Sequence, residues 1–179
     1  MKRSEMIRFI NGLNKDEASQ VLKALLEEDP LLAKKIYEAA MKVTANVDAD
    51  DVMDQVFWAL DVLDMDDLNN RSGRTRYGYV DPNDAAWELF EEALDPFIDE
   101  MKKSQQRVMS HTAKAQCIGI IRGLWKYEEE SSSDIKDWMV DAPGEYIERV
   151  VDEWRKGSPD SSDADIAEVM RAAKKTDSE

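Results

Sequence analysis

The acidic run DDVMD at residues 50–54 has the clearest spacing for chemistry in this chain. Carboxylates four residues apart lie on one face of a helix, where two of them can share a hard cation such as Mg²⁺ and hold it against a diphosphate. A helical wheel also supports a simpler interpretation, because Asp50 and Asp54 lie opposite the apolar stripe of the same helix. We therefore interpret the run as the solvent-exposed face of a helix.

A second group of acidic residues has the spacing found in magnesium-dependent hydrolases. All-α nucleotide pyrophosphohydrolases bind the metal with E-x-x-E and E-x-x-D pairs, and this chain has such pairs at 88–91 and 92–95. The residues that would bind the metal are Asp51, Asp54, Glu88, Glu91, Glu92 and Asp95. In a chain with 39 acidic residues these spacings also arise by chance, on the polar face of a helix. Metal-dependent hydrolysis of nucleotides or diphosphates is therefore the alternative function.

Nucleophilic catalysis and cofactor chemistry have little support. His111 and Cys117 are the only histidine and the only cysteine, so neither an intramolecular disulfide nor the usual ligand set of a zinc site can form. They lie six residues apart on one predicted helix, so their side chains diverge, and Cys117 is surrounded by apolar positions where a thiol is normally inert. The sequence has no glycine-rich phosphate loop. We therefore predict no catalytic residue, no metal and no cofactor.

The segment 69–80 is the one place where the local charge reverses. No acidic residue lies between Asp67 and Asp81. The basic and aromatic residues of this segment are Arg71, Arg74, Arg76, Tyr77 and Tyr79. Guanidinium groups beside tyrosine rings can bind a phosphate, a carboxylate or an unstacked base, and both residue types are common at binding hot spots. The other interpretation is that these arginines pair with the acidic helices of the same protein. We predict a loop that contacts a partner.

The charge balance narrows the classes of partner. The chain has 179 residues, with 24 Lys and Arg against 39 Asp and Glu, which gives a net charge of −15. Such a field repels phosphate backbones and anionic membranes, so direct nucleic-acid binding is disfavoured. The apolar runs are far shorter than the ~20 residues of a membrane span, and the N-terminus lacks the apolar stretch of a signal peptide. We therefore expect a cytoplasmic protein that does not bind membranes.

Helical spacing of apolar residues runs through the whole chain, and no stretch alternates as a strand does. The predicted helices lie at about 4–12, 16–28, 30–44, 49–66, 82–103, 105–127, 134–141, 143–156 and 163–174. Pro30 and Pro82 stand in the first turn of their helices, the usual place for a helix proline. The fold class is therefore all-α, with stacked antiparallel helical hairpins that form either an irregular HEAT-like repeat (an α-solenoid) or a compact helical bundle.

The predicted helix at 105–127 differs from the others in the width of its apolar face. Apolar residues cover roughly half of its circumference, so we expect a central helix with neighbours on more than one side. Gly119 and Gly123 lie four residues apart and would let the backbone of another helix approach closely. Trp87 lies on the predicted helix at 82–103 and Trp125 on the one at 105–127. We expect both rings to be largely buried in one cluster with apolar residues of these two helices.

The length of the chain suits a single domain, which we predict over residues 1–156. After Gly157 the sequence SPDSSDAD has the composition of a linker, and residues 157–179 contain only three apolar side chains larger than alanine. These bury too little area to offset the entropy of ordering the segment. We therefore predict a flexible acidic tail over 157–179, with at most a frayed helix.

Several segments together resemble a known helical region. The runs are LLEEDPLLAKKIYEAA (25–40), ALD (59–61), GYVDPNDAAWELFEEALDPFIDEMKKSQQ (78–106) and AQCIGIIRGLWKY (115–127). They look like the all-helical region C-terminal to the zinc finger of SWIM-finger proteins, over residues 20–155 or about three quarters of the chain. The resemblance implies a HEAT- or tetratricopeptide-like scaffold for protein contacts. The finger's cysteines and histidine are absent, so zinc binding is not implied here.

These observations favour a non-enzymatic module for protein–protein interaction. Helical stacks present grooves and faces to partners, and little in the composition suits catalysis. We expect the partner to be another protein, either an acidic segment or a second copy of this chain. The segment 69–80 is the predicted site of contact with this partner.

Overall fold

The computed structural model describes residues 2–44, 47–76 and 78–174, and the side chains of these residues except 30, 41–44 and 75. The fold is all-α, as predicted, apart from one short β-hairpin among these residues. The chain divides into two compact units, Met1–Thr44 and Ala45–Glu179, which we call the N-terminal unit and the body. We predicted one domain over 1–156, and the domain boundaries stay a prediction.

The N-terminal unit consists of three helices: α1 (Arg3–Asn11), α2 (Lys15–Glu28) and α3 (Pro30–Thr44). Their bounds follow the predicted ones closely. Asn14 caps α2, because its side chain accepts hydrogen bonds from two backbone N–H groups of the first turn. Pro30 begins α3 as predicted. Among the side chains described here, none is buried, although the apolar residues of these helices have helical spacing.

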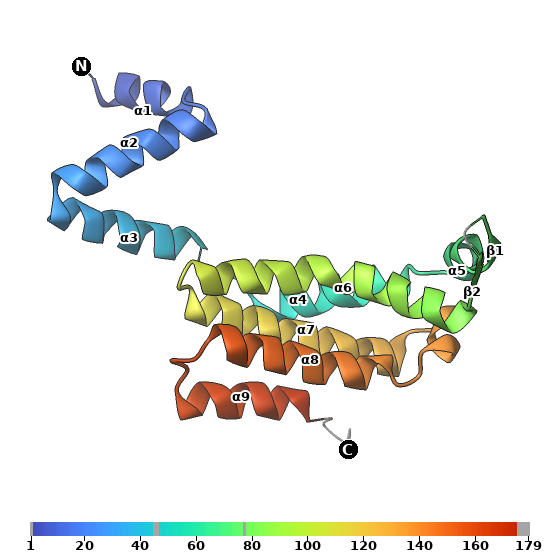
Figure 1. Cartoon of the computed structure of the whole chain (residues 1–179). Helices are drawn as coiled ribbons and strands as arrows, with labels where there is room; N and C mark the ends of the chain where they lie inside the picture. Colours follow the sequence, from blue (N-terminus) through green and yellow to red (C-terminus); the bar gives the residue numbers. More distant parts are fainter. Residues whose placement is uncertain (1, 45–46, 77, 175–179) are drawn as a thin grey trace. The chain divides into compact units, whose positions relative to one another are not determined.

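The body is a helical bundle, and Figure 1 shows its long helices side by side. Its elements in chain order are α4 (Ala49–Asp61), α5 (Met65–Arg71), β1 (Gly73–Thr75), β2 (Gly78–Val80), α6 (Pro82–Gln106), α7 (Ser110–Glu130), the 3₁₀ helix η1 (Asp134–Trp138), α8 (Ala142–Gly157) and α9 (Asp163–Ala173). The predicted helix at 49–66 is two helices, because Asp64 caps a new one with hydrogen bonds from two backbone N–H groups.

The central helix of the body is α7, as the width of its apolar face predicted. It contacts α4, α6, α8 and α9. The approach of α4 is close enough that a Cβ atom at Gly119 would lie 2.6 Å from the carbonyl oxygen of Ala49, and one at Gly123 would lie 2.6 Å from Cβ of Val56. The predicted role of the two glycines is therefore confirmed: they let the two backbones meet.

The core of the body lies between α4, α6, α7 and α8. Its largest fully buried side chains include Trp154, Tyr127 and Phe90, and the ring centroids of Phe90 and Tyr127 are 5.6 Å apart. Trp87 and Trp125 both pack against this one core, as predicted, although neither ring is fully buried. They also pack on different helices: Trp87 stacks on a tyrosine of α8, and Trp125 donates a hydrogen bond to α9.

The region after Gly157, which we predicted as a flexible tail, contains an ordered helix. Helix α9 packs on α7 and α8 (Figure 1). Val169 is fully buried, and Lys114 Nζ of α7 lies 2.7 Å from carboxylate oxygens of both Asp165 and Glu168. The apolar face of α7 is wide enough to accept this fourth neighbour, which the composition of the segment alone does not reveal.

The segment 69–80 is also more ordered than the predicted loop. It contains the end of α5 and an antiparallel β-hairpin in which Gly73 pairs with Val80, Arg74 with Tyr79, and Thr75 with Gly78. Gly73 and Gly78 have φ angles of 84° and 138°, which other residues rarely adopt. Three-residue strands are too short to show an alternating pattern, so the hairpin was not predicted.

Candidate functional site

The hairpin places two of the predicted contact residues side by side. Arg74 on β1 and Tyr79 on β2 are directly opposite in the register, so their side chains project from the same face of the ribbon. Both are exposed, and Tyr79 retains 71% of its accessible surface. Arg76 is exposed in the turn, and Tyr77 lies outside the described residues. We call Arg74 and Tyr79, with Arg76, the hairpin patch.

Arg71 has a different role from the rest of the predicted set. It ends α5, and its guanidinium Nη1 lies 2.7 Å from Oε1 of Glu92 on α6. This hydrogen bond raises the pKa of Arg71 and lowers the pKa of Glu92. Arg71 thus pairs with an acidic helix of its own protein, which was the other interpretation of these arginines, and it joins the base of the hairpin to α6.

The six acidic residues of the hydrolase hypothesis are spread over α4 and α6, and three of them pair with cations. Asp54 lies 2.8 Å from Nζ of Lys126, Glu91 accepts a hydrogen bond from Arg149, and Glu92 is bound to Arg71. The remaining members, which are Asp51, Glu88 and Asp95, are exposed. Over residues 2–44, 47–76 and 78–174, no group of three or more acidic, histidine or cysteine side chains has the arrangement of a metal site.

The DDVMD run lies as the wheel predicted, on the polar side of α4. Asp50 Oδ1 lies 2.8 Å from Nη1 of Arg122, and Asp54 pairs with Lys126 one turn further along α7. The hydrogen bond to Asp54 raises the pKa of Lys126, whose ammonium also lies 5.0 Å from the centroid of the Phe57 ring. These carboxylates therefore hold α4 against α7.

The lone cysteine and histidine lie apart on α7. Cys117 is fully buried, and this burial raises the pKa of its thiol to about 12. A thiol with that pKa stays protonated at neutral pH and is a poor nucleophile. His111 is exposed in the first turn of the helix. The structure thus does not bring the two together.

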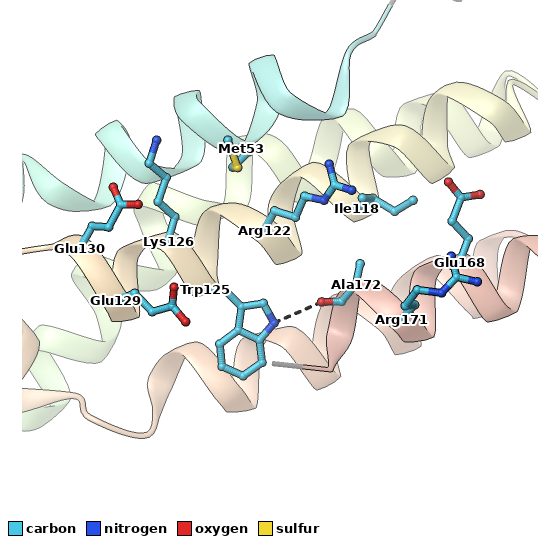
Figure 2. Close-up of a pocket in the computed structure, with 10 residues that line it drawn as sticks. All are labelled: Met53, Ile118, Arg122, Trp125, Lys126, Glu129, Glu130, Glu168, Arg171 and Ala172. Atoms are coloured by element: carbon cyan, nitrogen blue, oxygen red, sulfur yellow. Dashed lines mark hydrogen bonds between the residues drawn. The ribbon is translucent and has the colours of Figure 1, made fainter. Parts of the chain in front are cut away.

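Sequence reasoning missed a groove on the body. It has a volume of about 530 Å³ and lies between α4, α7 and α9 (Figure 2). Trp125 lines it, with its Nε1 donating a 3.2 Å hydrogen bond to the carbonyl oxygen of Ala172. Charged side chains of both signs, including Glu129 and Arg171, surround the opening. Such a mixed lining does not select a ligand of one charge.

Comparisons with known proteins give no match: no family model fits the chain, and neither a curated protein nor a solved structure is similar to it. The all-helical architecture is therefore established by the structure, and no family is identified. No helix in the described part of the chain has the length and apolar character needed to cross a membrane.

Proposed function

We propose that this protein is a non-enzymatic interaction module that binds an acidic segment of another protein through the hairpin patch. The observation that carries the proposal is the exposed pair of Arg74 and Tyr79 on one face of the hairpin. An arginine can bind a carboxylate with two parallel hydrogen bonds, and a tyrosine adds rigid apolar area at small entropic cost.

The local charge supports an acidic partner. The hairpin lies in a stretch of 13 residues, 68–80, that contains three arginines and no acidic residue. At physiological ionic strength the Debye length is about 8 Å, so the negative charge elsewhere on the body is largely screened from a ligand seated on the patch. The same negative charge disfavours DNA or RNA as the ligand, because these polymers extend well beyond the patch.

The helical scaffold belongs to the same proposal. A HEAT-like stack, as the resemblance to the helical region of SWIM-finger proteins implies, would hold the hairpin and the groove beside Trp125 on a rigid support. The ion pairs of Asp54, Glu91 and Glu92 fit this structural role better than metal-dependent hydrolysis, because a carboxylate that holds a helix is less free to bind a cation.

A fluorescence-anisotropy titration with a labelled ten-residue poly-glutamate peptide tests the proposal. We expect Arg74→Glu to weaken binding at least about tenfold, which corresponds to the loss of one charge-assisted contact. The control is Arg155→Glu, the same change of charge at an exposed site on α8. Equal affinity of the two variants, or no binding of the peptide to the wild type, contradicts the proposal.

A further inference from the structure

The N-terminal unit exposes an unusual amount of apolar surface. Nine of its large apolar side chains are between 40% and 75% exposed. They are Met6, Ile7, Phe9, Ile10, Val21, Leu22, Leu26, Leu31 and Tyr37. None of the side chains described in this unit is buried. The unit therefore lacks a core of its own.

The exposed residues follow the helical period. On α2, Val21, Leu22 and Leu26 lie on one side, and Gln20 and Ala24 lie on the other. On α1, Met6, Ile7 and Ile10 likewise share a side. These are the patterns of helices that pack against a neighbour. The apolar residues are therefore arranged as faces rather than scattered.

Such faces need cover if the helices are to be stable. Isolated helices shorter than about 12–15 residues are marginal in water, and these three helices have 9, 14 and 15 residues. A chain of about 40 residues or fewer rarely supports a fold alone, and the 44 residues of this unit bury no side chain that the structure describes. Another surface must therefore supply the packing that α1–α3 do not supply to one another.

We propose that the cover is the N-terminal unit of a second copy, so that the protein is a symmetric dimer joined through α1–α3. The charges allow two such units to meet. Residues 1–44 carry 8 Lys and Arg against 7 Asp and Glu, a net charge of +1, whereas residues 45–179 carry 16 against 32, a net charge of −16. Two N-terminal units do not repel each other, while two bodies do. The nearly neutral unit is therefore where copies can meet.

The body is less suited than a second N-terminal unit to pack on the apolar faces of α1–α3. Its large exposed apolar side chains are spread over the fold: Trp58 and Val62 near the end of α4, Tyr79 on β2, Val108 between α6 and α7, and Trp138 and Val140 around η1. Within residues 47–76 and 78–174, no helix exposes a row of large apolar side chains as long as those of α1 and α2. A second N-terminal unit, by contrast, carries faces of the same size and character.

The area also suits a dimer. If a large apolar side chain offers roughly 150–200 Å² when fully exposed, the nine residues together expose about 700–1,000 Å². A stable interface of standard size buries about 800 Å² on each partner. A two-fold axis lets the same patch serve both copies, so the contact closes at two subunits.

Light scattering after size-exclusion chromatography tests this on the full chain. We expect a mass near 41 kDa, twice the 20.5 kDa of one chain, at submillimolar concentration. Leu22→Glu with Leu26→Glu places two charges on the apolar side of α2 and is expected to raise the dissociation constant at least about a hundredfold. Gln20→Glu with Ala24→Glu adds the same charge to the opposite side and is expected to leave the dimer intact.

Hydrogen exchange tests the same proposal on the wild-type protein. It therefore does not depend on a variant that could lose the dimer simply because its helix unfolds. Amide protection in α1–α3 is expected to fall on dilution, while protection in α6–α8 stays constant. A monomer at every concentration overturns the proposal, as does protection of α1–α3 that is independent of concentration, which would indicate cover by the same chain. Equal masses for the two double variants also overturn it. So does amide protection of α1–α3 that develops only when lipid vesicles are added. The Arg74→Glu variant is expected to stay dimeric, so failure here is distinct from failure of peptide binding.

Discussion

The close contact between α4 and α7 makes Gly123→Ala a sharp test of the fold. A Cβ atom at this position would lie 2.6 Å from Cβ and 2.7 Å from Cγ1 of Val56, and 2.9 Å from the carbonyl oxygen of Met53. Carbon atoms in contact normally lie about 3.5–4.0 Å apart. Val56 is fully buried and its Cβ is fixed by the backbone, so α4 has to move away by about 1 Å.

Two effects of opposite sign decide the stability of this variant. Alanine is better than glycine inside a helix by about 0.8–1.0 kcal/mol. Overpacking a dense core costs about 1–3 kcal/mol, and here the obstacle includes main-chain atoms, which cannot change rotamer. We expect a net loss of about 1–2 kcal/mol, since the cost lies at the upper end of that range. The melting temperature should fall by about 2–8 °C for a chain of this size.

The matched control is Gly144→Ala in α8. A Cβ atom there would meet no other atom within 4 Å, so the gain in helix propensity is unopposed. We expect this variant to be as stable as the wild type or up to about 1 kcal/mol more stable. Urea unfolding followed by circular dichroism measures both variants. A Gly123→Ala protein at least as stable as the Gly144→Ala protein would refute the close approach of α4 to α7.

Two further predictions concern α9. Deletion after Gly157 is expected to lower the free energy of unfolding by about 1–3 kcal/mol, because it exposes the part of α7 on which Val169 packs. The fluorescence emission of Trp125 should shift to the red, because this side chain loses its hydrogen bond to α9. An unchanged urea midpoint contradicts this prediction. Hydrogen bonds from Lys114 and Ser162 lower the pKa of Asp165 to about 2, below its ordinary value of 3.8. The ionised Asp165 carboxylate, paired with Lys114, therefore stabilises the folded state above about pH 4, and this stabilisation is lost as the pH falls towards 2. The difference in melting temperature between wild type and Asp165→Asn should vanish over that range, and a constant difference contradicts the pairing.

Much of the fold follows from local sequence signals. Two helix starts could be predicted because a first-turn proline acts locally: Pro30 begins α3, and Pro82 begins α6. The central place of α7 was readable because the width of an apolar face shows how many sides of a helix must be covered. The spacing of Gly119 and Gly123 likewise predicted the close approach of another helix backbone.

The candidate site depended more on tertiary structure. The sequence showed a cluster of arginines and tyrosines, and only the hairpin register placed Arg74 beside Tyr79. It also showed that Asp50 and Asp54 face away from the apolar stripe. Their partners Arg122 and Lys126 are 72 residues away, and nothing local selects them. The interpretation of Arg71 changed for the same reason, because Glu92 becomes its neighbour only when α5 packs on α6.

The apolar faces themselves show the limit of reading a pattern. The composition of residues 157–179 predicted a flexible tail, whereas the spacing of apolar residues predicted the helices α1–α3. In the structure Val169 of α9 is buried where this helix packs on α7 and α8, and large apolar residues of α1–α3, such as Leu22, are exposed. An amphipathic pattern determines that a helix has a side to bury, because it depends only on the order of residues along one helix. Which surface covers that side depends on contacts between distant segments or between molecules, and those are decided by the tertiary and quaternary structure.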